Sequence, residues 1–277
     1  MLMARETRVA YGIVPHALFD EPLKETCWQL RGDEFVLRGE GEHYFHYRRG
    51  AGVTVERGPG VDVSEESLWL NGSVYAAIAS MNGLQSIHAS AVAFDGRVYA
   101  FTGPAGSGKS TLIAALGDLG FPMFCDDTLV LDLSDPDRIL CLPGHKRLKL
   151  SEEALALTGA ERQEEVSRTV GKFYAVPAAG SIEAPLPLTE LIFLETGPEA
   201  AIDRIRGGER VIRLQDDHYT AQLFDAARQF DLPSKFRHLC RLADQIEMSR
   251  FVRPRNTVDF NKTVALAANH LRARAAQ

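Results

Sequence analysis

The segment Gly103-Pro104-Ala105-Gly106-Ser107-Gly108-Lys109-Ser110 is the most informative stretch of this sequence. It fits the pattern G-x-x-x-x-G-K-[ST]. A β-rich run, 97–102, precedes it, and an apolar helical pattern follows over 111–119 and ends at Gly120. A strand, a glycine loop and a helix in this order allow successive backbone N–H groups to surround a phosphate at the positive end of the helix. We therefore expect a phosphate-binding loop at the start of an α/β domain.

The residues of this loop are expected to contact a nucleotide in different ways. Glycines at 103, 106 and 108 permit the backbone conformations that a phosphate cradle requires. Lys109 is expected to reach the β- and γ-phosphate oxygens, and the Ser110 hydroxyl to bind Mg²⁺. ATP and Mg²⁺ are thus the expected cofactors. The expected nucleotide-binding set is Gly103, Ala105, Gly106, Ser107, Gly108, Lys109, Ser110 and Thr111.

Two adjacent carboxylates, Asp126 and Asp127, follow the short apolar run 121–125. Neighbouring side chains at a strand end point to opposite sides, so we expect separate roles for them. One would serve the metal, and the other would face a phosphoryl acceptor as a base. The alternative is a solvated turn before the next strand, 128–133.

A histidine, His88, lies just before an expected hairpin. The runs 89–94 and 97–102 are separated by Asp95-Gly96, and Asp-Gly between β-rich runs is a strong hairpin signal. Because the second strand leads into the glycine loop, His88 is expected beside the phosphate site. The alternative is an ordinary packed or surface histidine.

A cationic clamp on the transferred phosphoryl group is also expected, because charge develops on that group during transfer. The run 167–174, with two cations and a glycine, fits a loop that closes over substrate, or else an exposed basic loop. The segment 147–150 alternates cations with leucines, which predicts a strand whose charged face could equally be solvated. The candidates are Arg147, Lys149, Arg168 and Lys172.

The composition is that of a globular chain. Its 277 residues include 31 Lys+Arg and 37 Asp+Glu, a net charge of −6, which excludes binding of nucleic acid through bulk positive charge. No apolar run approaches a membrane span, and residues 1–10 lack the apolar core of a secretion signal. The four cysteines show no C-x-x-C spacing. We expect a cytoplasmic protein with no nucleic-acid or membrane partner.

Two regions are expected along the chain. Residues 1–83 read as a β-rich lead-in with strands at 33–38 and 43–47 and a helix at 68–81. Residues 84–277 read as the catalytic domain, with further strands at 121–125, 128–133 and 188–195 and a helix at 151–157. A helical C-terminal segment, about 219–274, is expected to be helix core, or else a surface for dimerisation or peptide docking.

The sequence resembles HPr kinase/phosphorylase and, more closely, stand-alone HPr-kinase-like proteins of bacterial peptide-modification clusters. The resemblance rests on His88-Ala89-Ser90-Ala91-Val92, the hairpin, the Gly103–Ser110 loop, and Gly120-Phe121 leading to Asp126-Asp127. The lead-in and the segments 143–150 and 186–188 are also similar. Some of these relatives phosphorylate the C-terminal serine of a lasso-peptide precursor. The sequence departs from HPr kinases at Thr111, where those enzymes carry a glutamate.

The resemblance implies a fold and a set of roles. The fold would be an α/β P-loop kinase core of the HPr kinase C-terminal domain type, with the β-rich lead-in and the helical C-terminal segment. Asp126 would be the base, Asp127 would join Ser110 at Mg²⁺, and His88 and Lys109 would complete the catalytic set. The implied partner is a peptide or small protein with an acceptor serine, and assembly into a homo-oligomer stays open.

Two other functions also stay open. The chain could be a kinase or nucleotidyltransferase for a small hydroxylated metabolite. It could instead be a non-catalytic, nucleotide-sensing partner in a biosynthetic complex.

Overall fold

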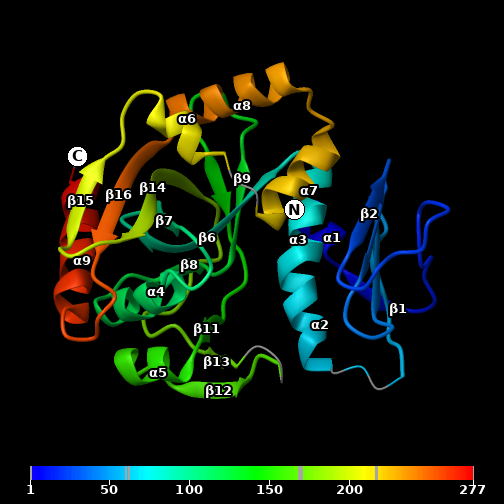
Figure 1. Ribbon diagram of the computed structural model, residues 1–277, viewed down its shortest axis with the longest axis horizontal. Helices are drawn as coiled ribbons and strands as arrows, with labels where there is room; N and C mark the ends of the chain where they lie inside the picture. The colour runs from blue at the N-terminus through cyan, green and yellow to red at the C-terminus, as the bar shows by residue number, and fades with distance from the viewer. Residues whose placement is uncertain (1, 60, 62, 168–170, 216–217, 277) are drawn as a thin grey trace. The chain divides into compact units, whose positions relative to one another are not determined.

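The computed structural model of the protein describes residues 2–59, 61, 63–167, 171–215 and 218–276 (Figure 1). Backbone contacts group the chain into two compact units. Unit 1 comprises Met1–Ser86 and Tyr219–Phe230, and unit 2 comprises Ile87–His218 and Asp231–Gln277. Unit 1 thus joins the N-terminal part of the chain to the later segment Tyr219–Phe230.

Unit 1 is built on a five-stranded sheet of order β1-β5-β4-β3-β2. The first strand runs parallel to β5, and the other pairs are antiparallel. The expected strands at 33–38 and 43–47 are confirmed as β3 and β4. The strands are β1 (Val9–Tyr11), β2 (Trp28–Arg31), β3 (Glu34–Arg38), β4 (Tyr44–Arg48) and β5 (Gly52–Glu56).

Helices cover one face of this sheet. Buried side chains that alternate along the strands, such as Phe35, Phe45 and Val55, form one core with Ile78 and Leu223. The expected helix at 68–81 is confirmed, and it begins earlier and includes a π-helical turn. The helices are α1 (Leu2–Glu6), α2 (Val63–Trp69), η1 (Leu70–Val74), α3 (Tyr75–Met81) and α7 (Tyr219–Arg228).

Unit 2 is built on a larger sheet of order β10-β9-β6-β7-β14-β16-β15, with β8 paired to β6. At its centre β7, β14 and β16 run parallel, so their carboxyl ends meet at one edge. The strands are β6 (Gln85–Phe94), β7 (Arg97–Thr102), β8 (Met123–Cys125), β9 (Thr128–Asp132), β10 (Leu140–Leu142), β14 (Leu186–Thr196), β15 (Ala201–Arg204) and β16 (Glu247–Arg253).

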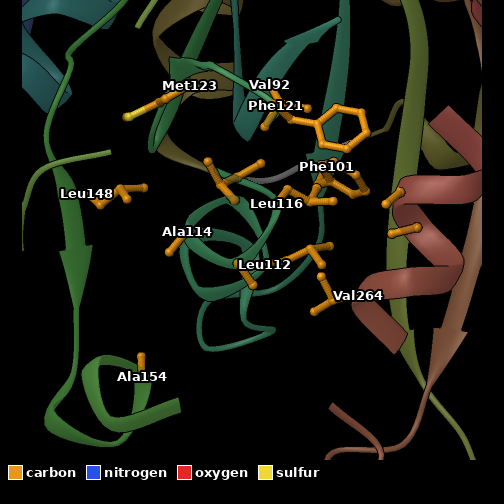
Figure 2. Packing of buried hydrophobic residues seen from close by; sticks show 14 of the residues in the cluster. Val92, Phe101, Leu112, Ala114, Leu116, Phe121, Met123, Leu148, Ala154 and Val264 are labelled. Carbon is orange, nitrogen blue, oxygen red and sulfur yellow. The ribbon is translucent and has the colours of Figure 1, made fainter. Parts of the chain in front are cut away.

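Both faces of this sheet are covered, because its central strands are apolar on both sides. On one face Phe101 of β7 packs with Leu112 of α4 (Lys109–Asp118) and Val264 of α9 (Phe260–Ala275), as Figure 2 shows. On the other face Ala100 lies in a second cluster with Leu242 of α8 (Leu232–Gln245). The glycine loop therefore begins at the end of β7, a rigid central strand that is packed on both faces.

Smaller elements complete unit 2. The expected helix at 151–157 is confirmed as α5 (Glu152–Thr158), and Ser151 caps it by accepting a hydrogen bond from the Ala154 N–H. A short helix, α6 (Glu209–Arg213), follows β15. A separate antiparallel sheet has the order β11-β13-β12 and consists of β11 (Leu148–Leu150), β12 (Arg162–Glu165) and β13 (Phe173–Ala175).

The hairpin at Asp95-Gly96 is confirmed, since both residues have positive φ (49° and 70°) and Phe94 pairs with Arg97. The expected helical C-terminal segment, about 219–274, contains α7, α8 and α9, but it also contains a strand that the sequence does not predict. This strand is β16, which pairs with β14 over seven positions and buries Met248 and Phe251. Long-range pairing favours a strand there, although the flanking segments have helical periodicity.

The four cysteines are free thiols. Among the described residues, no helix combines the length and the apolar character needed to cross a bilayer.

Candidate active site in unit 2

The glycine loop joins the end of β7 to the start of α4. Gly103 and Gly108 have φ of 149° and 85°, in the region that favours glycine. A Cβ at Gly103 would lie 3.0 Å from the carbonyl oxygen of Leu194, and one at Gly108 would lie 2.7 Å from Nη2 of Arg253. The loop thus requires glycine both for its backbone conformation and for its close packing on β14 and β16.

Lys109 lies in the first turn of α4 and is 7% exposed. Its Nζ donates to the carbonyl oxygens of Gly103, at 2.8 Å, and Pro104, at 3.2 Å. The ammonium group is therefore held against the loop, where it adds a full positive charge to the N-terminal end of the helix.

Asp126 is buried at the end of β8 and faces the loop. Its Oδ1 accepts hydrogen bonds from the hydroxyl groups of Ser110, at 2.8 Å, and Ser90, at 2.6 Å. Its Oδ2 accepts one from the backbone N–H of Lys149, at 3.2 Å. Ser110 and Asp126 thus present two neighbouring oxygen atoms, the donor type that Mg²⁺ prefers.

Asp127 points to a different group of residues, and its φ of 74° is unusual for a residue other than glycine. Nζ of Lys149 lies 3.1 Å from Oδ2, and Nδ1 of His88 lies 3.5 Å from Oδ1. Burial acts to raise the pKa of the Asp127 carboxyl, but Lys149 and His88 outweigh it and hold that pKa below its usual range. The side chain is 32% exposed and remains ionised.

His88 lies beside Asp127. Its Nδ1 is 3.1 Å from the carbonyl oxygen of Asp127, and its ring stacks on that of His218 with centroids 3.9 Å apart. Burial, assisted by the nearby charge of Lys109, lowers the pKa of His88 to about 4. The imidazole is thus neutral at pH 7, so it can orient the carboxylate without adding a charge.

The four expected clamp residues lie in different places. Lys149 is 7% exposed and contacts Asp127, so it does not lie on a solvated strand face, which was the alternative.

Arg147 instead lies over the Tyr174 ring, 3.8 Å from its centroid, and pairs with Glu164. Lys172 lies near enough to Asp127 to help lower the pKa of its carboxyl. Arg168 is outside the described residues.

The other residues expected to bind the nucleotide lie in the loop itself or in the first turn of α4. Ala105 and Gly106 are exposed at the tip of the loop, and Ser107 is half-buried. Thr111 is half-buried in the first turn of α4. All eight expected nucleotide-binding residues therefore belong to the loop and the start of its helix.

Several residues near the site were not expected from the sequence. Arg253 and Arg255, at and after the end of β16, donate to the carbonyl oxygens of Ser107 and Gly106. Ser90 and His218 contact Asp126 and His88, as described above. The run Phe251-Val252-Arg253 before Pro254 carries a β-strand signal, and recognising it would have placed both arginines at a strand end.

The donor set fits a nucleotide and a shared cation. The described residues include no group of three or more His, Cys, Asp or Glu side chains placed to hold a metal ion. A cation at Ser110 and Asp126 would consequently need further oxygen ligands from a phosphate chain or water, which is how Mg²⁺ is commonly bound with nucleotides. Ser110, Asp126 and Lys109 are the residues that would hold such a complex.

Comparison with known proteins assigns no family. No protein-family model and no curated protein matches the sequence. Among solved structures, the chain is similar to the Hpr(Ser) kinase/phosphatase from Coxiella burnetii, with 14% identity and a TM-score of 0.34. The alignment covers 68% of this chain and 98% of that chain.

Proposed function

We propose that this protein is a kinase that transfers the γ-phosphoryl group of ATP, with Mg²⁺, to a hydroxyl group of a serine in a peptide or small protein. The observation that carries the proposal is the division of the two adjacent carboxylates. Asp126 contacts the loop through Ser110, and Asp127 contacts His88 and Lys149. One carboxylate thus belongs to the phosphate side of the site and the other to its acceptor side.

The contacts favour an allocation of roles opposite to the one that the resemblance implies. Asp126 is 3% exposed, and both of its oxygens accept hydrogen bonds within the protein. It is therefore poorly placed to receive a substrate hydroxyl and well placed to serve a cation together with Ser110. Asp127 is more exposed and lies against the neutral His88, so we assign the base to Asp127.

The residues would act in the following way. Asp127 accepts the proton of the acceptor hydroxyl while the hydroxyl oxygen forms its bond to the γ-phosphorus. The bond from that phosphorus to the β,γ-bridging oxygen breaks, and ADP leaves. Lys109 stabilises the charge on the phosphate oxygens, and Lys149 keeps Asp127 ionised. Bound Mg²⁺ would supply further neutralisation of the phosphates.

The class of acceptor follows from the resemblance to stand-alone HPr-kinase-like proteins. That resemblance supports the C-terminal serine of a lasso-peptide precursor as the substrate. A small hydroxylated metabolite would need the same residues around the phosphates and the same base.

The test is transfer of radiolabelled γ-phosphate from ATP to a co-encoded precursor peptide. We expect Asp127→Asn to lower the transfer rate by about 10²–10⁴-fold, the usual contribution of a general base, with ATP binding retained. We expect Asp126→Asn to weaken Mg²⁺-dependent ATP binding. Retention of full transfer by Asp127→Asn, with loss of it in Asp126→Asn at saturating Mg²⁺, would restore the allocation that the resemblance implies.

The same assay separates the other functions. Label found only on a small metabolite would exclude the peptide acceptor, and a product mass showing an added nucleotide would indicate nucleotidyl transfer. ATP binding without turnover on any acceptor, unchanged in Asp127→Asn, would identify a nucleotide sensor.

A further inference from the structure

A cavity of about 360 Å³ lies beside the glycine loop at the carboxyl end of β14. Its walls include Gly103 and Pro104 of the loop, Phe193 and Glu195 of the strand, and Arg213 and Arg255. Its volume is within the range of small-molecule sites, about 300–1,000 Å³. None of the catalytic assignments above uses Phe193, Glu195 or Arg213.

The sheet order places this cavity on one side of the loop and the carboxylates on the other. In the sheet β7 lies between β6 and β14, and β8 pairs with β6. Asp126 and Asp127 follow β8, whereas the cavity is formed at the end of β14, where Phe193 is in register with Thr102 of β7. A molecule with phosphates on the loop and its transferable end near Asp127 would extend its other end towards the cavity.

The lining chemistry suits a sugar carrying a planar ring. Nη2 of Arg213 lies 2.6 Å from Oε1 of Glu195, and its guanidinium lies over the Phe193 ring, 5.8 Å from the centroid. Arg213 also pairs with Glu209, which fixes its position. A carboxylate has about four acceptor sites, so Glu195 can accept from a vicinal diol as well as from Arg213.

We propose that this cavity binds the nucleoside end of the nucleotide, with Glu195 accepting hydrogen bonds from the ribose hydroxyl groups. Pro104 and Phe193 provide apolar surface for the base, and Arg255 links this wall to the loop through the carbonyl oxygen of Gly106. The inference rests on the proposed function, because it requires that the loop hold the phosphates.

The test compares three ligands by calorimetry in the presence of Mg²⁺: ATP, 2′,3′-dideoxy-ATP and inorganic tripolyphosphate. We expect the protein to bind ATP about tenfold or more tightly than the dideoxy form, the effect of losing hydrogen bonds to a charged acceptor. In Glu195→Ala this ratio should approach one, while the affinity for tripolyphosphate stays unchanged. Asp203→Ala removes an exposed carboxylate from β15, which β16 separates from β14, and is the matched control, which should keep the ratio.

The outcomes separate this inference from the proposed function. Equal affinities for ATP and its dideoxy form in the unaltered protein, or equal weakening of all three ligands by Glu195→Ala, would overturn the cavity assignment. If tripolyphosphate binds and Lys109→Ala abolishes this binding, the loop remains supported as the phosphate site even though the assignment of the cavity has failed. If neither ATP nor tripolyphosphate binds, both proposals fail.

Discussion

Replacement of His88 by glutamine should change how the stability of unit 2 depends on pH. Burial and the charge of Lys109 lower the pKa of His88 to about 4, from an unfolded value of 6.5. Between these values the unfolded chain binds a proton that the folded chain does not. The contribution of neutral His88 is therefore fully present above pH 6.5 and is lost as the pH falls from there towards 4.

The size of the effect follows from the two pKa values of His88. At about pH 5 the unfolded imidazole is almost fully protonated and the folded one is largely neutral, so the loss is about 2 kcal/mol relative to neutral pH. A side chain 12% exposed is screened little by solvent, so the full effect is expected. In His88→Gln this loss is absent, and the decline in unfolding free energy towards pH 5 should be smaller by that amount.

The assay is urea unfolding followed by circular dichroism at about pH 7.5 and pH 5, without nucleotide or Mg²⁺. Burial also lowers the pKa of His145 to about 4, so His145→Gln should reduce the decline by a similar amount. An equal decline in the unaltered protein and in His88→Gln would refute the description of His88 as a buried neutral group.

Three further predictions concern the loop, its cationic neighbour and the core. Gly108→Ala should cost about 1–3 kcal/mol in a thermal unfolding assay and abolish ATP binding, because its φ is positive and its Cβ would meet Arg253. Lys149→Met should move the acidic limb of the pH profile of the proposed phosphoryl transfer to higher pH, because the lysine lowers the pKa of the Asp127 carboxyl. Leu112→Ala should cost about 2–5 kcal/mol on urea unfolding, because the side chain is completely buried under the sheet.

A specific experimental result would contradict each of these three predictions. Normal ATP affinity in Gly108→Ala would contradict the loop geometry, for which Gly120→Ala, at an open position with positive φ, is the control. An unchanged acidic limb in Lys149→Met would show that the lysine does not control the pKa of the Asp127 carboxyl. A cost near zero for Leu112→Ala, similar to that of truncating the exposed Leu119, would contradict its place in the core.

Local signals in the sequence were sufficient for the glycine loop, the hairpin before it and the helix after it. A left-handed backbone at Gly103 or Gly108 and a turn at Asp95-Gly96 depend on the residues at those positions, and so they can be read from neighbouring letters. The same reasoning predicted His88 beside the phosphate site, because the second strand of the hairpin leads into the loop.

The sequence could not assign β16, because its strand identity depends on pairing with β14, nearly sixty residues away along the chain. Helical periodicity in the flanking segments is a local signal, and the long-range ladder overrides it. Because the strand was not predicted, the positions of Arg253 and Arg255 were not predicted either. Only the parallel arrangement of the strands brings their side chains to the loop.

The sequence by itself determined which residues are candidates for the site of this protein: Lys109, Ser110, His88 and the pair Asp126 and Asp127. Only the tertiary structure decided which groups each of the two carboxylates contacts. Asp126 accepts from Ser90 of β6 and Asp127 pairs with Lys149 of β11, and both partners are distant in sequence. The tertiary structure likewise created the cavity at Glu195, since that cavity exists only where β14 ends beside the loop.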